Sequence, residues 1–161
     1  MTALAPREGT GMTLVRAPDT VELLESLAQH LTDLGLARYA PNGIYVGEGL
    51  PAIFFGQLPD KPDTAILLNA YNDDRSRDQG NPDYYVQLKF RAAGRDPRTV
   101  ERLGDSVFRA LDDLHNERHN GHTWGDVRIL LCHRHIRGPI ALEATNRYTR
   151  PDSYTITTNP S

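Results

Sequence analysis

The residues with the clearest potential for chemistry are histidines, which number six. His115 and His119 are four residues apart, the spacing that places two imidazoles on one helix face for a zinc ion. His133 and His135 alternate along an expected strand and could complete the ligand set. The segment HNERH differs from the zinc-protease pattern HExxH, in which glutamate directly follows the first histidine. A small zinc-dependent enzyme that uses these histidines is therefore the alternative from a different functional class.

Other patterns for catalysis or cofactor binding are weak. Cys132 is the only cysteine, so no disulfide forms within one chain, and its ILLC context predicts a buried side chain rather than an activated thiolate. No G-x-S-x-G elbow occurs, and GEGLPA at 47–52 lacks the third glycine of a nucleotide fingerprint. The carboxylates form no recognisable acid–base pair. We therefore expect a protein that is not an enzyme, with no catalytic residue, metal ligand or cofactor.

The stretch 84–114 provides the framework that must position any functional residue. Apolar and polar residues alternate from Tyr84 to Arg91, which predicts a half-buried antiparallel strand whose polar face lies away from the helices. After a break at Gly94, Asp96 can accept hydrogen bonds from free N–H groups and Pro97 suits the first helical turn. One apolar stripe follows at helical spacing, made of Val100, Leu103, Val107, Phe108, Leu111 and Leu114.

The other elements complete an α+β pattern. A helix is expected from Asp19, with capping-box spacing to Glu22 and an apolar stripe made of Val21, Leu24, Leu27, Ala28, Leu31 and Leu34. Short strands are expected within 38–55, long strands at 65–71 and 127–132, and an edge strand or C-terminal extension at 154–158. The polar segment 72–83 predicts a long exposed hairpin loop. This order predicts a mixed, mainly antiparallel sheet with two helices packed on one face.

Size and composition fit one globular domain. The chain has 161 residues, of which 39% are hydrophobic and 24% charged. We expect a flexible N-terminal arm at 1–13, a single domain at 14–158 and a frayed C-terminus at 159–161. The net charge of −3 argues against a dedicated duplex-binding protein. No apolar run is long enough to span a bilayer, and the arm lacks the apolar core of a secretory signal, which predicts a soluble protein made in a cytoplasm.

A group of polar and aromatic residues is suited to contact with another protein. Arginine and tyrosine are enriched at protein interfaces, and long polar loops often carry function. We therefore interpret ten residues as subunit or partner contacts rather than as nucleic-acid ligands. They are Asp73, Asp74, Arg75 and Arg77 in the expected loop, Tyr85 and Arg91 on the polar strand face, and Arg137, Arg147, Arg150 and Tyr154 in the basic C-terminal third.

Three longer segments carry a family resemblance through their order and spacing. Residues 43–71 contain a short apolar strand, the phrase GQLPDKPD and a second strand. Residues 83–114 contain a strand, FRAAGRDP and a helix with VFRAL. Residues 129–156 contain a GP break and end on NRYTRPDSYTI. Together they resemble the tail terminator, or minor capsid, proteins of long-tailed bacteriophages with non-contractile tails (siphophages).

The resemblance implies a structural role in the virion. Proteins of this family form a ring, commonly hexameric, that caps the tail tube, stops polymerisation of the major tail tube protein and meets the head-completion or connector protein. DNA passes through the ring without sequence-specific binding, and no membrane is involved. Assembly is expected in the host cytoplasm. Another head–tail neck protein, a stopper or adaptor, is the close alternative. A closed ring needs head-to-tail contacts, for which the arm 1–12 and the tail 154–161 are candidate strand donors.

Overall fold

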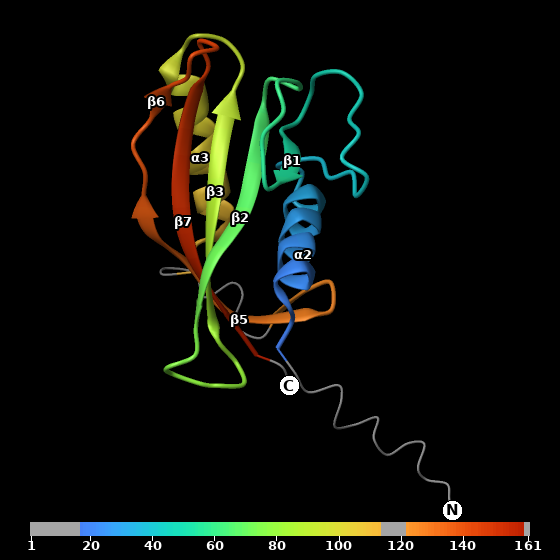
Figure 1. Cartoon of the computed structure of the whole chain (residues 1–161), viewed down its shortest axis with the longest axis vertical. Helices are drawn as coiled ribbons and strands as arrows, with labels where there is room; N and C mark the ends of the chain where they lie inside the picture. The colour runs from blue at the N-terminus through green and yellow to red at the C-terminus, as the bar shows by residue number, and fades with distance from the viewer. Residues whose placement is uncertain (1–16, 114–121, 160–161) are drawn as a thin grey trace, which may run out of the picture.

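A curled sheet with helices on one face is the framework of the computed structural model, which describes residues 17–113 and 122–159 (Figure 1). The described elements are α2 (Thr20–Asp33), β1 (Ala52–Phe55), β2 (Ala65–Asp74), β3 (Asp83–Ala92), α3 (Pro97–Leu111), β4 (His122–Trp124), β5 (Val127–Arg137), β6 (Ala141–Leu142) and β7 (Tyr148–Thr158). The strand order is β1-β2-β3-β7-β5-β4, with β6 also paired to β7. Among the described strands only β1 and β2 pair in parallel, so the predicted mixed, mainly antiparallel α+β fold is confirmed.

Helix α2 begins at the predicted capping box. The Glu22 N–H donates to the Asp19 carboxylate over 2.8 Å, and the Asp19 N–H donates to the Glu22 carboxylate over 2.9 Å. The buried stripe consists of Leu23, Leu27, Ala28 and Leu31. The prediction was wrong for Val21 and Leu34, which are 63% and 46% exposed. Two residues turn a helix by about 200°, so Val21 lies opposite the stripe that Leu23 begins.

Helix α3 covers the apolar side of β3 and β7. Asp96 caps its first turn by accepting from the Arg98 N–H over 3.0 Å, as predicted. Its buried positions are Val100, Gly104, Val107 and Leu111. Val100, Val107 and Leu111 join one core cluster with α2 and the alternate residues of β3. Phe108 is half-buried, and Leu114 lies outside the described residues. The polar residues of β3 lie on the opposite face of the sheet, as expected from their alternation.

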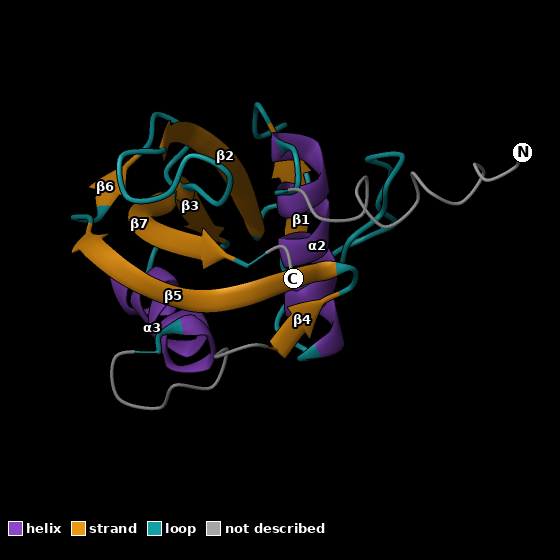
Figure 2. Cartoon of the chain, turned by 90° about the horizontal axis from the view of Figure 1, so that it is seen from below, coloured by secondary structure: helices purple, strands orange, loops and turns teal. Residues whose placement is uncertain are grey.

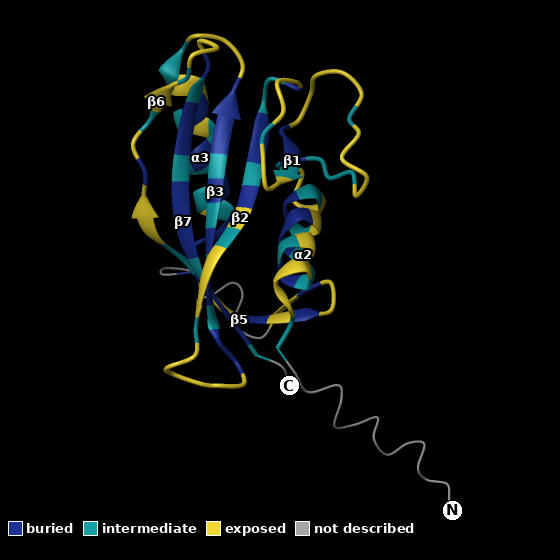
Figure 3. Cartoon of the chain, viewed as in Figure 1, coloured by how far each residue is buried: buried dark blue, intermediate teal, exposed yellow. Residues whose placement is uncertain are grey.

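Strand β7 corrects the predicted position of the C-terminal region. It pairs with β3 on one side and with β5 and β6 on the other, so it lies inside the sheet rather than at an edge. Most of its residues are buried, as the dark ribbon in Figure 3 shows. Residues 154–158 are therefore not free to add a strand to a neighbour. The residue pattern of 154–158 could not show whether this strand lies at the edge or in the centre of the sheet, because the neighbouring strands come from segments distant in sequence.

Two loop predictions also change. β2 extends to Asp74, so the exposed loop of the β2–β3 hairpin contains 75–82 rather than all of 72–83. Residues 44–46 form a loop rather than a strand, and β1 is the strand of the 38–55 region, joined by a single bridge between Arg38 and Ala52. The expected arm at 1–13 and residues 160–161 lie outside the described residues. No helix in 17–113 or 122–159 is long and apolar enough to cross a membrane.

Candidate functional site

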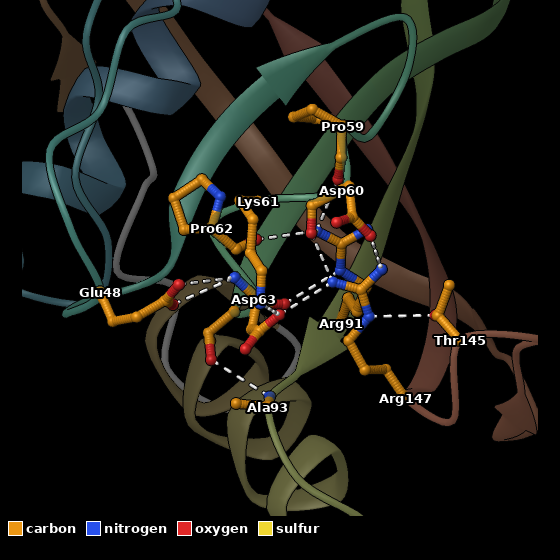
Figure 4. Close-up of polar contacts among 11 residues, drawn as sticks. Glu48, Pro59, Asp60, Lys61, Pro62, Asp63, Arg91, Ala93, Thr145 and Arg147 are labelled. Atoms are coloured by element: carbon orange, nitrogen blue, oxygen red, sulfur yellow. Dashed lines mark hydrogen bonds and ion pairs between the residues drawn. The ribbon is translucent and has the colours of Figure 1, made fainter.

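Two buried arginines hold the connection between β1 and β2 in place (Figure 4). Arg91, at the end of β3, donates to the carbonyl oxygens of Pro59 over 2.7 Å, Pro62 over 2.8 Å and Asp63 over 2.9 Å. Arg147, before β7, donates to the carboxylates of Asp60 over 3.1 Å and Asp63 over 3.0 Å. We call this connection, residues 56–63, the clamped loop. Its sequence is GQLPDKPD.

The electrostatics of the clamped loop follow from this geometry. Burial, and then the positive charge of Arg147, lower the pKa of Arg91 from its ordinary value. A hydrogen bond from Lys61, together with one from Arg147, lowers the pKa of the Asp63 carboxyl. The side-chain nitrogens of Arg91 donate hydrogen bonds to carbonyl oxygens of the clamped loop. The guanidinium therefore holds the loop in shape and is not available to bind an anion. A cavity of about 670 Å³ adjoins the clamp, lined also by Lys89 and Glu143, which pair over 3.8 Å.

A second polar cluster spans the concave face of the sheet, opposite the helices. The Tyr71 hydroxyl on β2 lies 3.3 Å from Nε2 of His135 on β5, although β3 and β7 lie between these strands. Nδ1 of His135 lies 3.2 Å from the Thr155 hydroxyl, and the Tyr85 ring lies 5.5 Å from the imidazole. Figure 2 shows β5 curving across the sheet in this region. Burial, and then the neighbouring His133, lower the pKa of His135 from its ordinary value.

A groove of about 480 Å³ lies beside this cluster. We call it the concave groove; its lining residues are Arg77, Asp83, Leu130, Leu131, His133, Thr155 and Thr157. The Arg77 guanidinium pairs with the Asp83 carboxylate over 3.1 Å, and the Thr157 hydroxyl donates to the same carboxylate over 2.8 Å. The charges of Arg77 and Asp83 are thus paired with each other within the subunit. The leucines remain as the free contact area of the groove.

The histidine hypothesis gains no support from this arrangement. His133 and His135 do lie on one face of β5, since both approach Thr155 or its groove. Within the described ranges, however, no group of three or more His, Cys, Asp or Glu side chains is placed to hold a metal ion. His115 and His119 lie outside those ranges.

The structure separates the ten predicted contact residues into two sets. Asp73, Arg75, Arg77 and Arg137 are exposed, while Asp74 and Tyr85 are half-buried. Arg75 pairs with Asp73 over 2.9 Å, and Arg137 pairs with Glu101 over 3.3 Å. For these six residues a role in contacts stays a prediction.

The other four were expected to be exposed, and this expectation was wrong. Arg91, Arg147, Arg150 and Tyr154 retain 3%, 8%, 0% and 0% of their exposure. A buried guanidinium is tolerated only where acceptors replace water, and each of the three arginines has such acceptors. The three arginines make these bonds within the subunit, to the clamped loop and to α3.

Arg150 is the centre of a network that sequence reasoning missed. Its guanidinium makes a two-pronged pair with Asp152, through bonds of 3.0 and 2.8 Å, and a third nitrogen reaches Glu101 on α3 over 2.9 Å. Burial by itself lowers the pKa of Arg150, but these hydrogen bonds outweigh it and the net shift is upward. A β-carbon on Gly104 would lie only 2.6 Å from Cζ of Arg150. The sequence signal was this glycine inside an amphipathic helix, where glycine is otherwise unfavourable.

Tyr154 is a buried residue whose polar group should not stabilise the fold. Its hydroxyl is buried and has no hydrogen-bond partner among the described residues, and burial raises its pKa. An unpaired buried hydroxyl costs free energy, so Tyr154→Phe should leave the free energy of unfolding unchanged or raise it by up to about 1 kcal/mol. Urea unfolding of the two proteins measures this difference. A loss above about 1 kcal/mol would mean that the hydroxyl has a partner in solution.

Cys132 is confirmed as a buried side chain. It is fully buried in β5, and burial raises the pKa of its thiol well above the ordinary value. Its backbone N–H donates to the Asp113 carboxylate over 2.9 Å. Because the thiolate is the reactive form, this cysteine is chemically quiet in the folded chain.

Comparison with known proteins provides the family. A family model described as bacteriophage tail terminator protein matches residues 30–159, which include every described strand and α3. No curated protein matches the chain. The match includes all three segments that carried the resemblance in the sequence, residues 43–71, 83–114 and 129–156. The match covers most of the 161 residues, and the chain belongs to the bacteriophage tail terminator family.

Proposed function

We propose that this phage tail protein is the subunit of a ring that caps the tail tube, ends polymerisation of the tube protein and joins the tail to the head connector. The observation that carries this proposal is the family match over residues 30–159. In this role the protein is structural and not catalytic. It remains in the tail or neck of the virion after assembly in the host cytoplasm.

The distribution of polar groups supports a structural role. The three most buried arginines bind carbonyl and carboxylate groups of their own chain. They therefore rigidify the loop and the helix that border the sheet, as a subunit needs if its contacts must repeat around a closed ring. The net charge of −3 also suits a conduit, because a strongly basic lumen would retain DNA.

Tube assembly in the presence of the protein tests the proposal. The cognate tail tube protein is allowed to polymerise with and without the chain, and tube length is measured by electron microscopy while native mass spectrometry gives the assembly state. We expect shorter tubes, a density at one tube end and a cyclic oligomer. Unchanged tubes together with binding to the head connector would instead identify a stopper or adaptor. Heat-unfolded protein at equal concentration is the control for non-specific effects.

A further inference from the structure

The loop between α2 and β1 exposes an unusual amount of aliphatic surface. We call residues 41–50 the apolar loop. Within it, Val46 is 88% exposed, Ile44 70% and Leu50 51%. Figure 3 shows this loop as an exposed segment beside β1. Single exposed aliphatic residues are ordinary, but three within seven positions of one loop concentrate apolar surface of the kind that marks a protein contact.

The apolar loop is held in shape by one guanidinium. Arg38 donates to the carbonyl oxygens of Leu50 over 2.8 Å, Val46 over 3.1 Å and Gly47 over 2.7 Å. The hydroxyl of Tyr45 donates to the Ile53 carbonyl, and its ring lies 5.0 Å from that of Phe54. Since Tyr45 is directed toward β1, its two aliphatic neighbours face solvent. The loop is therefore preformed with its apolar side chains outward, which lowers the entropic cost of docking.

The adjacent strand edge does not provide the contact itself. Arg38 bridges to Ala52, and the Ile53 N–H donates to the Arg38 carbonyl over 3.1 Å. The Tyr45 hydroxyl occupies the Ile53 carbonyl. These bonds occupy backbone groups of β1, so a partner at this edge must bind mainly through the side chains of the apolar loop rather than by adding a strand.

A second exposed apolar surface lies elsewhere on the same chain. The concave groove exposes Leu130 and Leu131, which are 37% and 36% exposed, and Asp83 on its rim is already paired. The groove is built by β5 and β7, whereas the apolar loop borders β1 at the other end of the strand order. A projection and a groove on different surfaces of one chain produce head-to-tail contacts, which close into a ring when the rotation permits.

We propose that the apolar loop of one subunit docks in the concave groove of the next, with Ile44 and Val46 against Leu130 and Leu131. This contact rests on the ring function proposed above. It assigns the subunit interface to two surfaces that the isolated chain leaves exposed. It also accounts for the internal pairing of Arg77 and Asp83, because an apolar partner could not satisfy charged groups in the groove.

Cross-linking tests the contact directly. The double variant Val46→Cys/Leu130→Cys is treated, under conditions in which the wild type is oligomeric, with a short bis-maleimide. We expect a covalent ladder that extends beyond the dimer, because each subunit then carries one site for each neighbour. Either single variant should yield no cross-linked dimer, and buried Cys132 keeps the wild type uncross-linked. Absence of the ladder in an oligomeric double variant overturns the contact, as does a cross-linked dimer in a single variant.

A charge substitution gives a second, independent test. Val46→Asp should raise the protein concentration required for half-assembly at least about tenfold, whereas Val21→Asp, which alters a 63% exposed aliphatic residue on α2, should leave it unchanged. Circular dichroism confirms that both variants are folded. If Val46→Asp still forms the ring but no longer binds tube protein, the apolar loop docks on the tube and the proposal is overturned. If the wild type forms no oligomer with or without tube protein, the ring function itself fails.

Discussion

Replacement of Arg150 by methionine should lower the free energy of unfolding by about 3 kcal/mol, the low end of the range for breaking a buried ion pair from one side. Methionine keeps much of the side-chain volume but leaves the fully buried Asp152 carboxylate with fewer donors. The remaining donors to Asp152 are Arg134, over 3.3 Å, and the Gly138 N–H, over 3.2 Å. α3 also loses its bond from Arg150 to Glu101. Urea unfolding measures the change.

A matched variant at an exposed arginine distinguishes the effect of breaking a buried ion pair from the effect of losing one positive charge. Arg98 also pairs with an aspartate, Asp96, over 3.0 Å, but its side chain is 74% exposed. Arg98→Met should therefore cost less than about 1 kcal/mol, because exposed ion pairs contribute little. Adding Asp152→Asn to Arg150→Met should recover part of the loss, since the buried charge is then removed. Equal losses from Arg150→Met and Arg98→Met would contradict the buried network.

The elements that could be predicted from sequence are those whose signals are local. The alternation of Tyr84–Arg91 and the Asp96-Pro97 helix start both appear in the structure, as β3 and α3. The capping box at Asp19 appears as well. Each depends on residues within one or two turns or on strand neighbours two apart, so the backbone conformation follows from the sequence nearby. Together with the strand–helix order, they were enough to predict the fold class.

The positions that failed depend on contacts across long sequence distances. Arg150 meets Glu101 across 49 positions, and Arg91 meets the carbonyl of Asp63 across 28. Nothing near either arginine in the sequence distinguishes it from exposed Arg98. The central position of β7 is of the same kind, because a strand's neighbours are chosen by the whole chain. Both arginines were therefore interpreted as surface residues, although distant segments of the chain supply buried acceptors for them.

Replacement of Arg91 by methionine should release the clamped loop and lower the free energy of unfolding by about 2 kcal/mol, within the range for hydrogen bonds from a charged donor. The carbonyl oxygens of Pro59, Pro62 and Asp63 lose their donor, and the bond from Arg147 to the Asp63 carboxylate of the same loop loses its rigid support. Because water can reach carbonyls once the loop opens, the cost should stay below that of Arg150→Met. Urea unfolding measures stability, and hydrogen exchange of the Asp63 N–H, which donates to Glu48 over 3.0 Å, measures loop opening.

The control for Arg91 lies four residues away. Arg95 is exposed in the turn before α3, and none of the hydrogen bonds and ion pairs that hold the clamped loop among the described residues comes from it, so Arg95→Met removes the same charge from the same region and leaves those bonds in place. It should leave both stability and exchange of the Asp63 N–H unchanged. Arg91→Lys should recover little, because a single ammonium cannot reach the divergent carbonyls that a planar guanidinium spans. If Arg91→Met unfolds like the wild type and the Asp63 N–H exchanges at the wild-type rate, the guanidinium does not hold the loop in solution. If instead exchange accelerates while the 84–92 strand stays protected, the clamp acts locally, and loop order and sheet stability can be varied separately in one subunit.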